Sequence, residues 1–253
     1  MTAILETRDL TIHFGGQVAV DAVSLAFHAG TTTAIVGPNG AGKTSFFNLV
    51  SGQLRPSAGD VFLNGRRITD LPTPVRARLG LGRAFQLTNL FPALSVLENV
   101  RLAVQARAGA GLGFFRPAVA RTDLTERAQA WLTETKLTAR ANDLVTALSH
   151  GDQRKLEVTM MLALEPEVFM FDEPTAGMSV DEVPVVLDLI AAIAARRDKT
   201  VLLVEHKMDV VRRLADRVVV LHQGAVVADG EPAEVVASAI VQEAYLGIRP
   251  TNG

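Results

Sequence analysis

The feature that most constrains this chain is a glycine-rich segment between an apolar, β-branched run and a helical pattern. It reads Gly37-Pro38-Asn39-Gly40-Ala41-Gly42-Lys43-Thr44 and is followed by Ser45. Glycines permit a tight loop whose backbone N–H groups point inwards, and a helix start behind that loop adds partial positive charge. Lys43 would bridge the β- and γ-phosphates of a nucleotide, and the Thr44 hydroxyl would ligate Mg²⁺. The segment therefore predicts a nucleoside triphosphate site on a strand–loop–helix unit.

A second segment, Phe169-Met170-Phe171-Asp172-Glu173, ends an apolar run with two carboxylates. Because successive side chains of a strand point in opposite directions, the two acids can take different roles. Asp172 would bind the metal through water, and Glu173 would polarise the attacking water as a general base. The alternative is an acidic pair at an ordinary strand end. Together with the glycine-rich segment, the pair predicts hydrolysis of the nucleotide as well as binding.

Hydrophobic periodicity predicts an α/β fold. Residues 4–27 follow a period of two that breaks at Gly15-Gly16, which indicates a β-hairpin. Residues 168–171 and 200–204 are short apolar runs, typical of strands covered on both faces of a parallel sheet. Helices are expected from Lys43 to near Gly52, and after a capping-box pattern at residues 179–182. The predicted architecture is a P-loop core with a mainly parallel sheet and an antiparallel N-terminal β-subdomain.

The middle of the chain, roughly residues 92–147, has a different pattern. Helical stretches at residues 96–106 and 124–137 surround a glycine-rich stretch at 107–115. We expect a helical subdomain inserted into one domain of residues 1–253, whose core and β-subdomain are residues 1–91 and 148–247. Phe114 and Phe115 either contact a membrane or partner or belong to a plain loop, and Trp131 is expected in the core.

Composition and charge exclude several classes of protein. The 25 Lys and Arg residues against 27 Asp and Glu provide no global basic field for nucleic acid. The absence of cysteine excludes disulfides and thiolate chemistry. The first residues lack the apolar stretch of a secretory signal, and the most apolar helical pattern, at residues 183–195, is shorter than the roughly 20 residues that span a bilayer. We expect a cytoplasmic chain that does not cross a membrane by itself.

A third segment, Leu148-Ser149-His150-Gly151-Asp152-Gln153, lies between the first two. Ser149 is expected to cap a helix whose first turn holds Asp152, so that the helix presents its positive end outwards. With these three segments the chain resembles the ATP-binding cassette family, the nucleotide-hydrolysing subunits of transporters, over residues 5–247. The resemblance implies that Ser149 and Gly151 contact the γ-phosphate bound to another subunit. His150 and Asp152 depart from the usual LSGGQ form, and a plain helix cap is the alternative.

The resemblance assigns further roles, with ATP and Mg²⁺ as the implied cofactors. Gln86 falls where the family places a magnesium-sensing, partner-coupling glutamine, and His206 where it places a histidine that holds Glu173 and the water in line. Phe14 matches the aromatic residue that stacks on adenine, with a core phenylalanine as the rival interpretation. Ser179 replaces the aspartate that commonly ends the dimer-contact loop, and capping of the next helix is a sufficient structural reason for it.

Within the family, the chain is similar to the branched-chain amino acid importer group at residues 80–92, 176–179, 205–208 and 244–247. This similarity implies a head-to-tail homo- or heterodimer, attached to a membrane permease and served by an extracytoplasmic binding protein. The dimer would lie at the cytoplasmic face of a bacterial inner membrane. Its cargo would be branched-chain or other hydrophobic amino acids. Importers of urea, amides and aromatic acids share much of the pattern.

Two other function classes are open at this point. One is a non-transport cassette that acts on nucleic acid or ribosomes. Such proteins usually carry coiled coils, zinc modules or a second cassette, and the sequence has none, so no nucleic-acid partner is expected. The other is a nucleotide-binding module without hydrolysis, against which Glu173 argues.

Overall fold

A computed structural model of the 253-residue chain describes residues 3–84, 90–108, 118–180 and 183–238. The chain forms two compact units. The first unit comprises Met1–Arg83, Glu167–Glu173 and Ala191–Gly253, and the second comprises Ala84–Pro166 and Pro174–Ile190.

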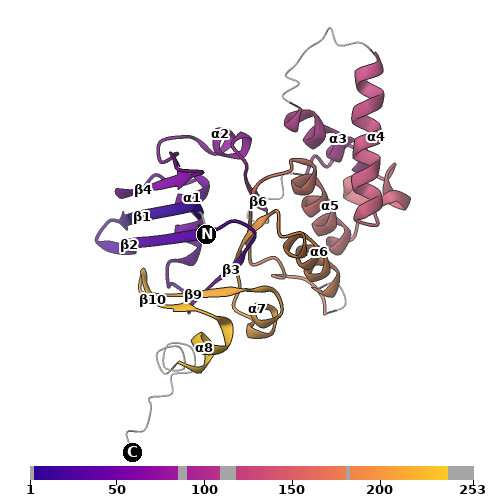
Figure 1. Cartoon of the computed structure of the whole chain (residues 1–253). Helices are drawn as coiled ribbons and strands as arrows, with labels where there is room; N and C mark the ends of the chain where they lie inside the picture. Colours follow the sequence, from indigo (N-terminus) through magenta and orange to yellow (C-terminus); the bar gives the residue numbers. More distant parts are fainter. Residues whose placement is uncertain (1–2, 85–89, 109–117, 181–182, 239–253) are drawn as a thin grey trace, which may run out of the picture. The chain divides into compact units, whose positions relative to one another are not determined.

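The first unit contains an antiparallel sheet with the strand order β2-β1-β4-β5 (Figure 1). Its strands are β1 (Ala3–Phe14), β2 (Gln17–His28), β4 (Ala58–Leu63) and β5 (Arg66–Arg67). The hairpin of β1 and β2 turns at Gly15-Gly16, as the periodicity predicts. The antiparallel N-terminal sheet is therefore confirmed.

A second sheet of the same unit has the order β10-β9-β3-β8-β7-β6. Its strands are β3 (Thr32–Val36), β6 (Leu81–Ala84), β7 (Val168–Asp172), β8 (Thr200–Val204), β9 (Arg217–His222) and β10 (Ala225–Gly230). Strand β3 pairs in parallel with β8 and β9, and β7 pairs in parallel with β8. Every residue of β3, β7 and β8 is buried, which is why these strands are continuous apolar runs in the sequence.

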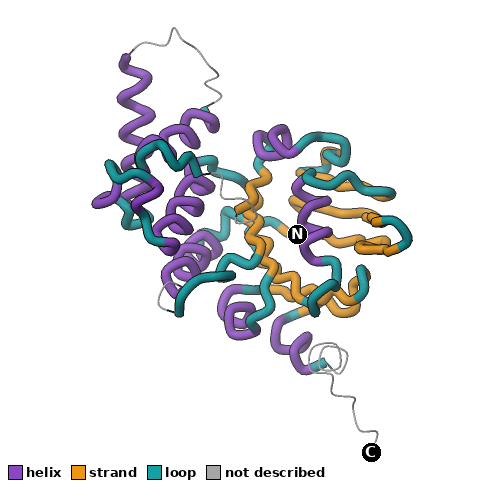
Figure 2. The backbone as a smooth tube through the Cα atoms, turned by 180° about the vertical axis from the view of Figure 1, so that it is seen from behind, coloured by secondary structure: helices purple, strands orange, loops and turns teal. Residues whose placement is uncertain are grey.

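Helix α1 (Lys43–Ser51) fills the space between the two sheets, as Figure 2 shows from behind. Its fully buried Phe46, Phe47, Leu49 and Val50 share one core with residues of β1, β3 and β7. On the other face of the six-stranded sheet, Val211 of α7 (Met208–Leu214) and Val235 of α8 (Pro232–Ala237) pack against β3 and β9. Because alternate residues of β3 face opposite layers, the strand that leads into the glycine-rich loop is packed on both faces.

The end of α1 is held by a buried arginine that the sequence analysis did not single out. Arg76, on α2 (Thr73–Arg78), is 1% exposed and donates to the carbonyl oxygens of Leu49 and Val50 at 2.8 and 2.6 Å. It also donates to the carbonyls of Thr69 and Leu71, which tie α2 to the preceding turn. Burial lowers the pKa of Arg76 to about 10. These bonds satisfy carbonyls that a helix end leaves without intrahelical partners.

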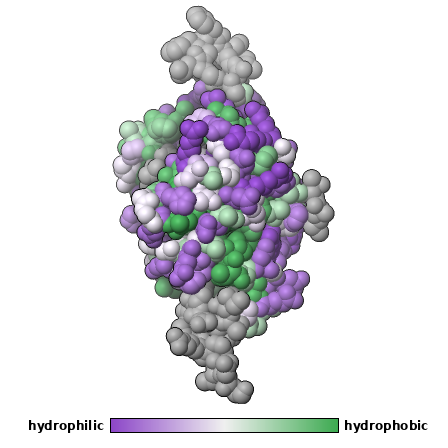
Figure 3. Space-filling model, turned by 90° about the vertical axis from the view of Figure 1, so that its left-hand side faces the viewer, coloured by the Kyte–Doolittle hydropathy of each residue, from purple (hydrophilic) through white to green (hydrophobic). Residues whose placement is uncertain are grey.

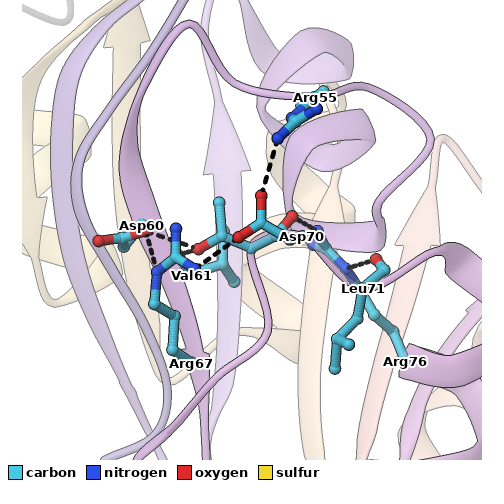
Figure 4. A network of polar contacts seen from close by, with 8 residues as sticks. Arg55, Asp60, Val61, Arg67, Asp70, Leu71 and Arg76 are labelled. Atoms are coloured by element: carbon cyan, nitrogen blue, oxygen red, sulfur yellow. Dashed lines mark hydrogen bonds and ion pairs between the residues drawn. The ribbon is translucent and has the colours of Figure 1, made fainter.

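Surface ion pairs lie to one side of this buried cation (Figure 4). Arg67 pairs with Asp60 and with Asp70, both at 2.6 Å, and Arg55 pairs with Asp70 at 3.2 Å. These side chains are at least one third exposed, so water screens each pair and its contribution to stability is small. The buried hydrogen bonds of Arg76 therefore stabilise this region more than the surface ion pairs do.

The second unit is helical. It contains α3 (Val96–Arg107), α4 (Ala118–Glu134), α5 (His150–Ala163) and the first part of α6 (Val183–Ala195), with 3₁₀ turns at Thr138–Arg140 and Val145–Ala147. Helix α4 begins at Ala118 instead of the predicted 124 and ends at Glu134. Trp131 packs against the core of this unit, as expected. The unit contains the predicted 92–147 subdomain and also α5.

Some expected features lie outside the described residues. These are Phe114, Phe115 and the acids at 181 and 182 of the expected capping box. Among the described residues, no helix has the length and hydrophobicity needed to cross a bilayer. The molecular face in Figure 3 mixes hydrophilic and hydrophobic side chains, and no continuous apolar surface covers it.

Candidate functional site

The glycine-rich loop connects the end of β3 to the start of α1, as predicted. Gly37 has a φ of 153° and Gly42 a φ of 98°, values that favour glycine. A Cβ at Gly37 would collide with the carbonyl oxygen of Leu221, and one at Gly42 with that of Ala19. The loop thus needs glycine at these positions for its conformation and for close packing.

The loop is also fastened by its backbone to the turn between β9 and β10. The Gly224 N–H donates to the Ala41 carbonyl at 3.0 Å, and the Asp21 N–H donates to the Gly224 carbonyl at 2.9 Å. A strand of the antiparallel sheet is therefore linked through one turn to the loop. This linkage fixes the loop without using its side chains.

The start of α1 fits an anionic group. Gly42 precedes the helix in a left-handed conformation, no side chain caps the helix, and its first turn holds no acid. The first N–H groups of a helix have no intrahelical acceptors and carry the positive end of the dipole. The chain itself therefore leaves this helix end without a side-chain acceptor.

Lys43 lies in the loop and is 7% exposed. Its Nζ donates to the carbonyls of Gly37 and Pro38 at 2.7 and 2.9 Å. Burial lowers its pKa, while the charges of Glu173 and Asp172 act in the opposite direction. An ammonium that bonds the carbonyls of its own loop can exchange them for phosphate oxygens, which are stronger acceptors.

The two predicted acids lie at the carboxyl end of β7. The strand ends at Asp172, which is 8% exposed and pairs with Arg83 at 2.7 Å. Burial raises the pKa of Asp172, and the Arg83 guanidinium opposes that shift. A carboxylate oxygen is a ligand that Mg²⁺ prefers, so Asp172 fits a magnesium site.

Glu173 differs from the sequence-based expectation in its backbone. Its φ is 48°, in the left-handed region, and its N–H donates to the Val204 carbonyl at 3.0 Å. The separation of the two acids therefore comes from a sharp backbone turn instead of strand alternation. Such a conformation costs about 1–3 kcal/mol in a non-glycine residue and is typical of functional sites.

His206 follows β8, and its side chain is 52% exposed. The preceding Glu205 is fully buried, and its Oε1 accepts the backbone N–H groups of His206 and Lys207 at 3.1 and 3.0 Å. Nδ1 of His206 lies 3.6 Å from the same oxygen. The carboxylate of Glu205 thus fixes the backbone from which His206 reaches outwards.

The structure describes most of the remaining residues predicted for this site. Phe14 ends β1 and is 49% exposed, so it is not a core residue, and stacking on adenine stays a prediction. Thr44 and Ser45 lie in the first turn of α1, and Asn39 and Gly40 lie in the loop. Gln86 lies outside the described residues.

In the second unit, Ser149 caps α5 as predicted. Its Oγ accepts the Asp152 N–H at 3.1 Å, and Lys155 pairs with the Asp152 carboxylate at 2.7 Å. Gly151 is buried and His150 is exposed. The positive end of this helix is therefore ordered by its own first turn.

Two residues of the site were missed by the sequence analysis. Arg83 holds Asp172, and Glu205 holds the backbone at His206. The available signals were an arginine within the short β6 pattern and a carboxylate that ends the apolar run of β8. Neither signal identifies its partner without the fold.

The fold and the site define a nucleotide-binding ATPase of the P-loop class. Comparison with protein families then gives a match of residues 20–176 to the ABC transporter family. The chain belongs to this family, whose cassettes bind and hydrolyse ATP.

Relatives match almost the whole chain. It is 37% identical over 249 residues to the high-affinity branched-chain amino acid transport ATP-binding protein LivG of Salmonella typhimurium, covering 96% of this chain and 98% of LivG. It is 38% identical, with the same coverage, to BraF of Pseudomonas aeruginosa, which has the same description. It is 32% identical to the lipopolysaccharide export ATP-binding protein LptB of Acidithiobacillus ferridurans, over 98% of this chain.

Solved structures agree with these matches. An ATP-binding cassette of an ABC transporter in its ADP conformation gives a TM-score of 0.82 at 25% identity, covering 98% of this chain and 100% of that one. A dimeric cassette in a post-hydrolysis state, bound to ADP and phosphate, gives 0.75 at 25% identity, covering 90% and 98%. The α/β fold predicted from the sequence is thereby confirmed.

Proposed function

We propose that this chain is the ATP-hydrolysing subunit of an importer that takes up branched-chain or other hydrophobic amino acids through a membrane permease. The observation that carries the proposal is the match of LivG and BraF to 96% of the chain. The proposal is also supported by the positions of the motifs, on the loop after β3 and at the carboxyl ends of the adjacent strands β7 and β8. The alternative cargoes, urea, amides and aromatic acids, would use the same ATPase.

Binding of ATP would use the loop of residues 37–45. Backbone N–H groups of the loop and of the α1 start would hold the phosphates, while Lys43 leaves the carbonyls of Gly37 and Pro38 to bond them. Thr44, Asp172 and Gln86 would hold Mg²⁺, which neutralises phosphate charge when bound. Phe14, half-exposed, would offer its ring to the adenine.

Hydrolysis would depend on residues at the ends of β7 and β8. Glu173 would orient and polarise the attacking water, since its left-handed backbone turns it out of the strand. His206 would hold this water and the γ-phosphate in line, with its backbone fixed by the buried Glu205. Phosphoryl transfer depends mainly on such positioning and on charge.

A second copy or a related cassette would complete the site. Ser149 and Gly151 at the start of α5 would contact the γ-phosphate bound to the partner, in a head-to-tail dimer. A helix start is suited to an anion because its N–H groups point outwards and its dipole is positive there. The dimer would attach to permease subunits at the cytoplasmic face of the membrane and receive cargo from an extracytoplasmic binding protein.

The assignment of Glu173 is tested by Glu173→Gln, with Glu234→Gln on the exposed start of α8 as the matched control. Turnover should fall by about 100-fold or more, because a positioned general base contributes about 10²–10⁴-fold. ATP affinity should stay within about twofold, because Glu173 does not hold the phosphates. Unchanged turnover in the variant would remove Glu173 from the role of base.

The cargo is tested by reconstituting the ATPase with the permease and binding protein encoded beside it. Leucine, isoleucine or valine should stimulate ATP hydrolysis, whereas urea and aromatic acids should not. Stimulation by urea or by aromatic acids alone would contradict the proposed cargo and leave the ATPase intact. Tight, salt-sensitive binding of nucleic acid by the purified chain would instead favour the non-transport alternative.

A further inference from the structure

The most informative contact outside the assigned residues is the buried ion pair of Arg83 and Asp172. Arg83 lies on β6 and Asp172 ends β7. The guanidinium donates through Nη2 to Oδ2 of Asp172 at 2.7 Å, and the two side chains are 6% and 7% exposed. Water screens a pair buried to this degree only weakly, so the charge of each partner affects the other.

Arg83 is held in place by more than this carboxylate. Its Nη1 donates to Asn48 Oδ1 at 2.7 Å, Ser51 Oγ at 2.8 Å and Gln53 Oε1 at 3.1 Å. Its guanidinium carbon also lies 5.7 Å from the centre of the Phe47 ring. Four residues on α1 or just after it thus position the cation. The glycine-rich loop leads into the first turn of the same helix. The positive charge is built into the site and does not depend on Asp172 for its location.

We propose that Arg83 is a positioning residue that serves as the resident counter-ion of Asp172 and shares this carboxylate with Mg²⁺. The inference rests on the proposed function, in which Asp172 is a metal ligand. When no metal is bound, a buried carboxylate without a cationic partner would be costly, and Arg83 removes that cost. When Mg²⁺ is bound, two cations lie near one carboxylate and repel each other.

This arrangement predicts a linkage between stability and metal affinity. Arg83 stabilises the metal-free site more than the metal-bound site, so it weakens Mg²⁺ binding by the same factor. A site of this kind loses less stability when the metal leaves with the product. A purely structural tie between β6 and α1 would stabilise both states equally and would leave metal affinity unchanged.

The test compares Arg83→Met and Arg83→Lys with the wild-type protein, with Arg78→Met on the exposed side of α2 as control. Thermal unfolding is followed in EDTA, and binding of a fluorescent ADP analogue is titrated with Mg²⁺. Arg83→Met should lower the metal-free Tm by about 10 °C, because it leaves a buried carboxylate unpaired. In this variant, the Mg²⁺ concentration that gives half of the maximal increase in ADP binding should fall about fivefold. The reason is that Arg83 no longer repels Mg²⁺.

In the same experiment the affinity for ADP in EDTA should stay within about twofold, since the loop alone holds the phosphates. Arg83→Lys keeps the charge and should retain the wild-type Mg²⁺ requirement within about twofold. A Mg²⁺ requirement that is unchanged or higher in Arg83→Met would overturn the proposal. If Arg83→Met does not fold, Arg83→Gln tests the same requirement, because it also removes the charge.

Asp172→Asn separates this inference from the function on which it rests. If Asp172 is a metal ligand, this variant loses most of the effect of Mg²⁺ on ADP binding. An undiminished effect would refute the ligand assignment itself. A lost effect in Asp172→Asn together with an unchanged requirement in Arg83→Met would refute only the counter-ion role.

Discussion

Helices α1 and α5 both follow a loop that is expected to meet phosphate, yet their first turns are built in different ways. Helix α1 begins behind Gly42 without a side-chain cap and without an acid in its first turn. Helix α5 begins behind Ser149, whose hydroxyl accepts the Asp152 N–H, and the Asp152 carboxylate pairs with Lys155. The chain thus leaves the start of α1 without its own acceptor and supplies one at the start of α5.

The other ends of the two helices show the reverse. The last carbonyls of α1 accept bonds from the buried Arg76, and Gly52 ends the helix in a left-handed conformation. Helix α5 ends at Ala163, and the backbone N–H of the next residue, Leu164, donates to carbonyls of the last turn. Helix α1 gains no stability from a side-chain cap at its start, but the hydrogen bonds of Arg76 stabilise its end. A helix start can therefore stay uncapped when the far end of the helix is fixed by tertiary contacts.

The largest effect should come from the end of α1. Arg76→Met removes four hydrogen bonds that a buried guanidinium donates to backbone carbonyls, so we expect a loss of about 4 kcal/mol in the free energy of unfolding. Tm should fall by about 10 °C in thermal unfolding. Arg55→Met is the control, because it removes only a surface pair of the same network. Equal losses in both variants would contradict the special role of Arg76.

The second-largest effect should come from a substitution at the uncapped start of α1. Lys43→Gln removes a charge that should make two charge-assisted bonds to phosphate, so ADP affinity should fall by about 3 kcal/mol, or roughly 150-fold. Equilibrium binding of a fluorescent ADP analogue measures this loss. Lys136→Gln, at an exposed position, should bind like the wild type. Retained affinity in Lys43→Gln would mean that backbone N–H groups suffice.

A smaller effect should follow from removing the cap of α5. Ser149→Ala should cost about 1 kcal/mol in the free energy of unfolding, whereas Ser149→Asn keeps a capping oxygen and should cost less. Thermal unfolding distinguishes the two variants. ATP hydrolysis should fall in both if the hydroxyl itself contacts phosphate. A wild-type rate of ATP hydrolysis in Ser149→Asn would mean that Ser149 acts only as a helix cap.

The smallest effect should come from the acid in the first turn of α5. Asp152→Asn removes a favourable charge near the positive helix end and the pair with Lys155, worth together about 0.5–1 kcal/mol at low salt. The difference in Tm from the wild type should shrink in about 0.5 M salt, because these charges are partly exposed. A salt-independent difference would point to packing instead of charge.

The sequence predicted the parts of this protein that depend on local pattern. The strand–loop–helix unit was visible because glycines, lysine and threonine occur at fixed spacing, and the buried strands because they are uninterrupted apolar runs. The cap at Ser149 was visible because a capping side chain bonds a residue three positions away. The start of α4 was placed too late, since a pattern of mixed residues marks a helix end poorly.

What lay beyond the sequence were contacts between residues far apart in the chain. Arg76 meets carbonyls 26 and 27 positions away, and Arg83 meets a carboxylate 89 positions away. The turn at Glu173 depends on the carbonyl of Val204 in the neighbouring strand. Such pairings follow from how the strands are ordered in the sheet, which no local pattern specifies.

The sequence by itself therefore determined the nucleotide loop, the two acids and the cap of α5, because each is a short-range arrangement that glycine conformation, strand burial or helix capping imposes locally. Only the tertiary structure decided how these parts are held. It placed one buried arginine against the end of α1 and another against Asp172, because a buried cation must find acceptors wherever the folded chain brings them.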